Sequence, residues 1–178
     1  AGSYIAPFAY LGTPEALETI NTFFRNPKPD WSERRGALFF LPQNASFTTV
    51  PGLERDLQTQ MSLEFAKKIE KASTVGRLLL IQATNLDESI PHAFNFVDAA
   101  RTATALGDSK NMREILLASS AIPVLFPPRI IDGTLYVDGG VGCNFYYGGR
   151  PSIASETFGG IWKRKHPDAP IPKTRYSV

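Results

Sequence analysis

The feature that most constrains the fold is a short, continuous apolar run inside the segment RLLLIQATNLD at 77–87. A run of this length is too short for a fully buried helix, and it is typical of a strand that is covered on both faces. An amphipathic segment at 62–73, with apolar residues at helical spacing, comes just before it. This alternation of helix and buried strand predicts an α/β fold with a mainly parallel sheet.

Other segments fit the same fold class. Helices are predicted at 13–25, 110–121 and 153–167, an edge strand at 93–100 and a further strand at 174–178. Residues 36–61 combine a short apolar stretch with a polar one, and they predict mostly loop. No internal repeat or linker divides the chain, so we expect a single domain over 1–178.

The composition excludes several classes of function. Of 178 residues, 43% are hydrophobic and 20% are charged, which is typical of a globular domain. A net charge of +2 argues against a nucleic-acid partner. Cys143 has no second cysteine to pair with, and no Cys/His spacing predicts a metal site. No apolar run is long enough for a transmembrane segment.

Two aspartates precede glycine in RIIDGTLYVDGG at 129–140. Asp132 and Gly133 separate two β-rich runs, and this dipeptide predicts the type I′ turn of a hairpin. Asp138 lies at the far end of the second run, where a hairpin does not need it. Local physics leaves two interpretations open for Asp138: a second turn, or a catalytic carboxylate at the carboxyl end of a strand.

Three segments resemble the patatin-like phospholipases: AGSYIAPFAYLG at 1–12, LLLIQATNLD at 78–87 and LLASSAIPVLFPPRIIDGTLYVDGG at 116–140. The resemblance runs over residues 1–150. It implies a three-layer α/β fold with a mainly parallel central sheet flanked by helices, incomplete at the N-terminus. It also implies a lipid acyl hydrolase with a serine–aspartate dyad, in which Asp138 accepts the proton and Gly139 and Gly140 leave the carboxylate unobstructed.

The family's serine lies in a Gly-x-Ser-x-Gly motif at a sharp turn from strand to helix. In the matching register Ala1 and Gly2 are the last two residues of that motif, so the serine is expected just before Ala1. Ser3 falls one position beyond the motif, and Ser119 and Ser120 are expected to pack at a helix end. We therefore expect a fragment that is inactive alone, and the residues present leave its localisation undetermined.

The resemblance implies a lipid or phospholipid ester as substrate, met at a membrane surface, and no cofactor. The basic run Lys163-Arg164-Lys165 suits anionic headgroups, although a solvated helix face explains it equally well. Two alternatives remain open. One is a Ser-His-Asp esterase that uses His166, since the other histidine, His92, precedes Asp138. The other is a degenerate, non-catalytic module of the same fold.

Overall fold

The structure, a computed structural model, describes residues 2–36, 45–74, 76–143 and 158–171. The chain divides into two compact units, Ala1–Asn144 and Phe145–Val178. The described part of the second unit contains α8 (Phe158–Lys165), which confirms the middle of the helix expected at 153–167. Lys163 and Arg164 are exposed on it. The strand expected at 174–178 lies outside the described residues.

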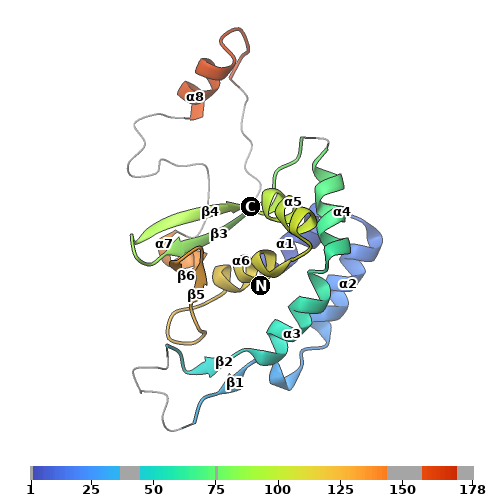
Figure 1. Ribbon diagram of the computed structural model, residues 1–178, viewed down its shortest axis with the longest axis vertical. Helices are drawn as coiled ribbons and strands as arrows, with labels where there is room; N and C mark the ends of the chain where they lie inside the picture. Colours follow the sequence, from blue (N-terminus) through green and yellow to red (C-terminus); the bar gives the residue numbers. More distant parts are fainter. Residues whose placement is uncertain (1, 37–44, 75, 144–157, 172–178) are drawn as a thin grey trace. The chain divides into compact units, whose positions relative to one another are not determined.

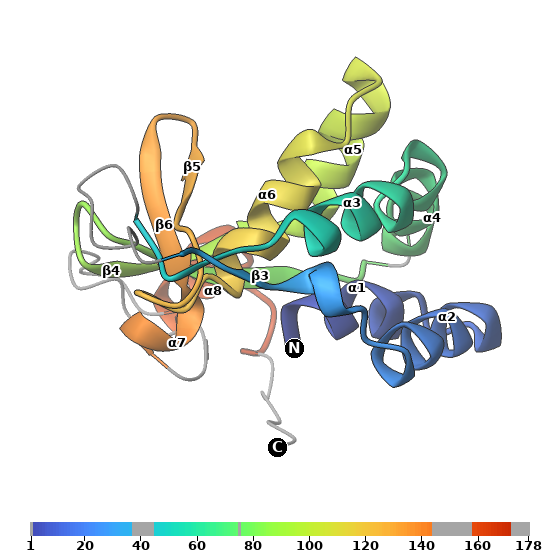
Figure 2. The ribbon, with the colours of Figure 1, turned by 90° about the horizontal axis from the view of Figure 1, so that it is seen from below.

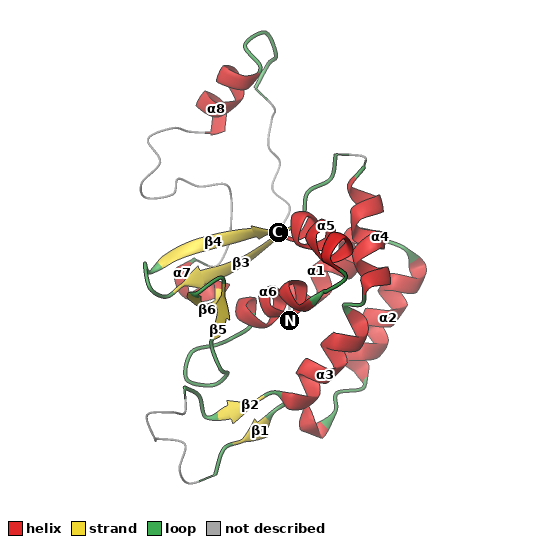
Figure 3. Cartoon of the chain, in the orientation of Figure 1, coloured by secondary structure: helices red, strands yellow, loops and turns green. Residues whose placement is uncertain are grey.

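The first unit combines a group of helices with a four-stranded sheet (Figures 1 and 3). Its elements are, in order, α1 (Gly2–Leu11), α2 (Pro14–Arg25), the 3-10 helix η1 (Pro29–Trp31), β1 (Glu33–Arg34), β2 (Thr48–Thr49), α3 (Pro51–Gln60), α4 (Leu63–Ser73), β3 (Leu80–Asn85), β4 (Ile90–Asn95), α5 (Phe96–Leu106), α6 (Lys110–Ser119), β5 (Arg129–Ile131), β6 (Thr134–Asp138) and α7 (Gly139–Gly142). Figure 1 shows α6 between the sheet and helices α1 and α3, in agreement with its packing contacts. The expected α/β class is therefore confirmed.

The four-stranded sheet has the order β4-β3-β6-β5, and every neighbouring pair is antiparallel. The prediction of a mainly parallel sheet must be corrected for the described strands. For two of the three pairs the physical reason is the length of the connection: 86–89 joins β3 to β4 and 132–133 joins β5 to β6, and a parallel pair needs a crossover of a dozen or more residues. The third pair, β3 and β6, is antiparallel although these strands are far apart in the chain. The apolar run at 77–87 contains the central strand β3 (Leu80–Asn85), in which Ile81 and Ala83 are buried. The expectation of a strand covered on both faces is wrong for the start of the run, because Leu78 and Leu80 are exposed.

Capping hydrogen bonds at the first turns of three helices show where the predicted elements are correct and where they are wrong. Thr13 accepts a hydrogen bond from the Ala16 N–H at the start of α2, and Ser62 accepts one from the Phe65 N–H at the start of α4, so both predicted helices are confirmed. The edge strand predicted at 93–100 is wrong beyond Asn95. There β4 ends, because the Asn95 side chain accepts hydrogen bonds from two N–H groups of the first turn of α5.

Helix α3 was missed within the segment expected to be loop. Pro51 occupies its first turn, where the missing N–H costs nothing, and Leu57 is buried to 2% exposure. Gly52 lies so close to η1 that an added Cβ would come within 2.5 Å of the Asp30 carbonyl oxygen. Gly52 therefore permits a close contact between α3 and η1.

Helix α6 supplies the centre of the core. Its buried side chains face the sheet on one side and α1, α3 and α5 on the other. Met112 and Leu116 are fully buried, as are Met61 before α4 and Phe96 at the start of α5. Because α6 contacts β3, β5 and β6, the position of its C-terminal end is fixed relative to the sheet.

The short helix α7 is held against β3 by two polar side chains of that strand, Gln82 and Thr84. The amide nitrogen Nε2 of Gln82 donates to the Gly139 carbonyl at 2.7 Å and to the Cys143 carbonyl at 2.7 Å. The Thr84 hydroxyl accepts from the Gly142 N–H at 2.9 Å. Figure 2 shows α7 directly at the end of β6. These bonds fix the chain as it leaves Asp138.

We predict that Asn95→Ala lowers the free energy of unfolding by about 1 kcal/mol, because two N–H groups at the start of α5 lose their acceptor. Asn95→Ser is the matched control, since a serine hydroxyl can accept the same bonds. Chemical denaturation followed by circular dichroism measures both variants. Equal losses for Ala and Ser would contradict the capping role.

We also predict that Gly139→Ala destabilises the fold by about 1–3 kcal/mol, the usual range for overpacking. An added Cβ would come within 2.6 Å of the Gln82 carbonyl oxygen, which belongs to a central strand and cannot move aside. Gly2→Ala is the control, because nothing lies within 4 Å of a Cβ added there. Thermal unfolding compares the two variants, and similar melting temperatures would contradict the close contact.

Candidate active site

Asp138 ends strand β6, and its main chain is fixed on both sides. Its N–H donates to the Ala121 carbonyl at 2.9 Å, just beyond the end of α6. Its carbonyl accepts from the Thr84 hydroxyl at 2.9 Å on β3. The backbone that carries this carboxylate is therefore held by the neighbouring strand and by the central helix, and its position does not depend on a free loop.

The Asp138 side chain is half-buried, and it is only partly engaged. Oδ1 accepts a hydrogen bond from the Gly140 N–H at 2.7 Å, as at the start of a helix. Within the described residues, Asp138 forms no ion pair. The carboxylate can therefore accept a further hydrogen bond from another group.

The two glycines after Asp138 have different surroundings. Gly139 is buried against the Gln82 main chain, so its missing side chain permits the packing of α7 on β3. The Gly140 N–H orients the carboxylate. Gly2 is exposed at the first position of α1. Ala1 lies outside the described residues.

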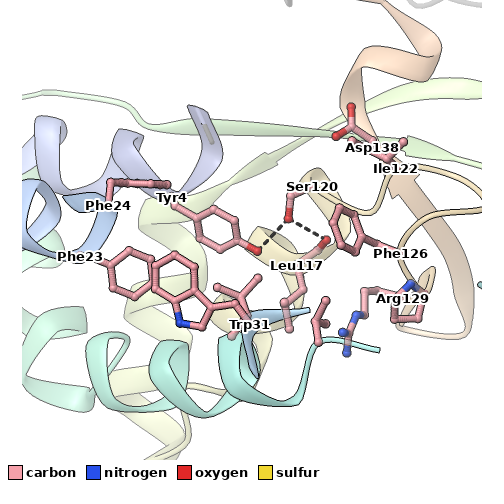
Figure 4. Close-up of a pocket in the computed structure, with 13 residues that line it drawn as sticks. Tyr4, Phe23, Phe24, Trp31, Leu117, Ser120, Ile122, Phe126, Arg129 and Asp138 are labelled. Carbon is pink, nitrogen blue, oxygen red and sulfur yellow. Dashed lines mark hydrogen bonds between the residues drawn. The ribbon is translucent and has the colours of Figure 1, made fainter. Parts of the chain in front are cut away.

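Asp138 lines a pocket of about 230 Å³ whose wall is mostly apolar. The aromatic part of the wall consists of Tyr4, Phe23, Phe24, Trp31 and Phe126. Ser120, Arg129 and Asp138 supply polar groups, and the Arg129 guanidinium is paired with carboxylates of Glu54 and Glu114. In Figure 4 Asp138 and the pair Phe23 and Trp31 lie on opposite sides of the Tyr4–Ser120 contact. The pocket therefore offers an apolar space with one half-buried carboxylate.

A hydrogen bond between Tyr4 and Ser120 joins α1 to the same frame. The two hydroxyl oxygens are 2.7 Å apart (Figure 4). The Ser120 hydroxyl can donate to the carbonyls of Leu116 and Leu117 at 3.0 and 3.2 Å, and it then accepts the Tyr4 proton. Burial raises the pKa of Tyr4 to about 12, so the phenol stays protonated at neutral pH. Ser120, which was expected only to pack at a helix end, therefore also connects the end of α6 to α1 through its hydrogen bond with Tyr4.

Within the first unit, the structure does not bring His92 to Asp138. His92 lies on β4 in register with Ala83, which is in register with Asp138 on its other side. Two strand spacings, roughly 10 Å, therefore separate the backbones of His92 and Asp138. The His92 ring packs against Phe94 with centroids 4.4 Å apart. His166 belongs to the second unit, where its ring packs against Trp162.

The described part of the chain contains neither a metal-binding cluster nor a membrane-spanning helix. There, no group of three or more His, Cys, Asp or Glu side chains could hold a metal ion. Among the helices of those residues, none has both the length and the apolar character that a membrane span requires.

Sequence reasoning missed the residues that position Asp138. Gln82 and Thr84 interrupt the apolar run of β3 at alternate positions, so both lie on one face of the strand. A polar pair on one face of a buried strand indicates a specific partner, and this signal could have identified them. The Tyr4–Ser120 bond spans 116 residues, and no local pattern predicts it.

Comparison with known proteins gives one match. The family model for patatin-like phospholipases matches residues 1–147 of the chain. A search of curated proteins and a search of solved structures returned no match. The matched range includes Asp138, the glycines after it and the whole described pocket. Because this range is most of the 178 residues, the chain belongs to the patatin-like phospholipase family.

Proposed function

We propose that this domain hydrolyses carboxylic esters of lipids, with Asp138 as the proton acceptor of a serine nucleophile. Membership of the patatin-like family suggests lipid acyl hydrolase activity. The observation that carries the finer proposal is the position of Asp138, a half-buried carboxylate without an ion pair in the wall of an apolar pocket. A single three-layer domain over 1–178 stays a prediction.

The proposed reaction needs a serine hydroxyl that faces Asp138. In the register expected above, that serine comes just before Ala1 and therefore just before α1. Support comes from the link between α1 and Asp138: Tyr4 bonds Ser120, and the next residue, Ala121, accepts the Asp138 N–H. A residue at the start of α1 is therefore tied to the helix end that also holds Asp138.

The proposed proton transfers follow from this arrangement. The serine Oγ attacks the ester carbonyl carbon, and its proton passes to Asp138. The tetrahedral intermediate collapses, the alcohol leaves with the proton from Asp138, and an acyl-serine remains. A water molecule then attacks the acyl carbon and gives its proton to Asp138. The fatty acid leaves as the proton returns to the serine oxygen, so the enzyme is regenerated.

The apolar pocket is the proposed place for the acyl chain. Its wall takes Tyr4 from α1 and Ile122 and Phe126 from the segment after α6. An apolar wall with a few polar groups is typical of small-molecule sites. The Arg129 charge in the wall is balanced by Glu54, so the pocket does not favour an anionic chain end.

We predict that Asp138→Asn lowers kcat/KM for p-nitrophenyl and phospholipid esters by a factor on the order of 10²–10⁴ or more, because the base is lost. Asparagine keeps the oxygen that accepts the Gly140 N–H, so the fold should survive. Asp132→Asn is the matched control, since it also precedes glycine but lies in the hairpin turn, where asparagine is equally suitable.

The assay uses the protein that carries the motif serine. Full activity in Asp138→Asn would contradict the role of Asp138, and absence of activity in both the unmodified protein and the Asp132→Asn control would favour the non-catalytic module.

We further predict that His166→Ala and His92→Ala each keep activity within roughly threefold of the unmodified protein, the spread expected of a surface change. A dyad needs no imidazole, whereas a Ser-His-Asp esterase would lose its base in His166→Ala. Steady-state kinetics on one soluble ester measures both variants. A loss in His166→Ala as large as that in Asp138→Asn would overturn the dyad in favour of a triad.

A further inference from the structure

Two aromatic rings separate the pocket beside Asp138 from a second cavity. The rings of Phe23 and Trp31 are stacked, with centroids 4.4 Å apart and planes at 26°. Both side chains line the pocket of Asp138, and both also line a second pocket of about 350 Å³. The stacked pair is therefore a partition one or two side chains thick.

The two pockets that share these rings differ in the polarity of their lining residues. On the Asp138 side the wall is mostly aromatic and aliphatic. On the other side Thr22, Asn26, Lys28 and Asp56 line the cavity. An alkyl chain is therefore favoured up to the rings, and beyond them it would meet polar and charged groups whose hydration it would disturb.

The indole of Trp31 is held in place from the polar side. Its Nε1–H donates to Asp56 Oδ2 at 2.7 Å, and Lys28 Nζ lies 2.8 Å from Asp56 Oδ1. The Asp56 side chain is only 11% exposed. Burial alone would raise the pKa of Asp56, but the bonds from Lys28 and Trp31 outweigh it and lower that pKa, so the acceptor stays ionised.

The turn that carries Trp31 is also docked on α3. The Asp30 carboxylate accepts from Arg55 at 2.8 Å, and Gly52 permits the close approach of the Asp30 main chain. A tryptophan has an apolar face for an alkyl chain and one N–H for a polar partner, so it suits a wall between two such spaces. The contacts on both sides restrain the indole to one orientation.

From this arrangement we infer that Trp31, held by Asp56, is a specificity-determining wall that limits the length of the acyl chain. The inference rests on the proposed function, because it takes the ligand to be an acyl chain that enters from the Asp138 side. Loss of the indole lengthens the apolar pocket by the volume of the ring, and the lengthened pocket accepts a longer chain. Trp31 acts on the bound chain and has no part in proton transfer.

The first test is a chain-length profile with p-nitrophenyl esters from butyrate to palmitate. In Trp31→Ala, kcat/KM for the longest esters relative to butyrate should rise by roughly tenfold or more, because the space that the indole leaves borders the apolar wall and takes additional methylenes. Trp162→Ala is the matched control: it removes an indole whose N–H also donates, at 3.1 Å to the Pro170 carbonyl, but it lies outside this pocket. An unchanged profile in Trp31→Ala overturns the inference.

A second pair of variants distinguishes the effect of the Trp31 indole from that of Asp56, which accepts its hydrogen bond. Asp56→Ala keeps the indole but removes its acceptor, so the profile should shift in the same direction as in Trp31→Ala and by a smaller factor. Asp98→Ala is the control, because Asp98 also forms an ion pair, with Arg101, and it lines neither pocket. A shift in Asp98→Ala equal to that in Asp56→Ala contradicts the role of the Asp56 bond.

The third test does not need hydrolysis. The chain has two tryptophans, so Trp31 is the only one in Trp162→Phe. Fatty acids brominated near the carboxylate or at the chain end quench tryptophan fluorescence on contact. In Trp162→Phe, a medium-length acid brominated at its chain end should quench more strongly than one brominated near the carboxylate. In Trp31→Phe, where only Trp162 emits, the two acids should quench equally.

These tests separate the inference from the proposed function. If chain-end bromine quenches Trp31 but no ester is hydrolysed, the proposed serine–Asp138 dyad is contradicted, whereas the role of Trp31 as the end of the acyl pocket stands. Hydrolysis that depends on Asp138, with equal quenching by both acids, would retain the dyad and overturn the wall.

Discussion

The arrangement of the site depends on two hydrogen bonds made by the main chain of Asp138. One joins it to the end of α6 through the Ala121 carbonyl, and the other joins it to β3 through the Thr84 hydroxyl. Because α6 is packed in the core and β3 is central in the sheet, the carboxylate is positioned by the most buried elements of the domain. The same helix end bonds Tyr4, so α1 shares this rigid frame. A base weaker than histidine needs such fixed geometry.

The proposed chemistry and the proposed selectivity come from different parts of the chain. Asp138 belongs to the sheet, whereas the partition at Trp31 belongs to the segment between α2 and α3, whose support is the polar cluster around Asp56. Changes in that segment can alter the space for the substrate without moving the carboxylate. Separate supports of this kind are how a stable scaffold carries variable specificity.

Local patterns in the sequence predicted much of the fold. The capping residues Thr13 and Ser62 identified two helices, and Asp132 and Gly133, both with positive φ, form the expected hairpin turn. The direction of the strands was wrong because an apolar run reports burial and not pairing. Asp138 was selected from the sequence by resemblance. The polar residues Gln82 and Thr84 on one face of β3 were a usable signal for its supports. The Tyr4–Ser120 and Trp31–Asp56 bonds could not be predicted, because they join residues that are 25 or more positions apart.

The most direct test of the central claim is a crystal structure of the protein after reaction with an alkyl phosphonate ester, which leaves a stable phosphonyl group on the nucleophile. The account predicts a phosphonylated serine before α1 whose Oγ lies within about 2.6–3.2 Å of the Asp138 carboxylate, with the alkyl chain in the pocket that ends at Trp31. A phosphonylated side chain elsewhere, or a histidine in place of Asp138 beside that serine, would contradict it.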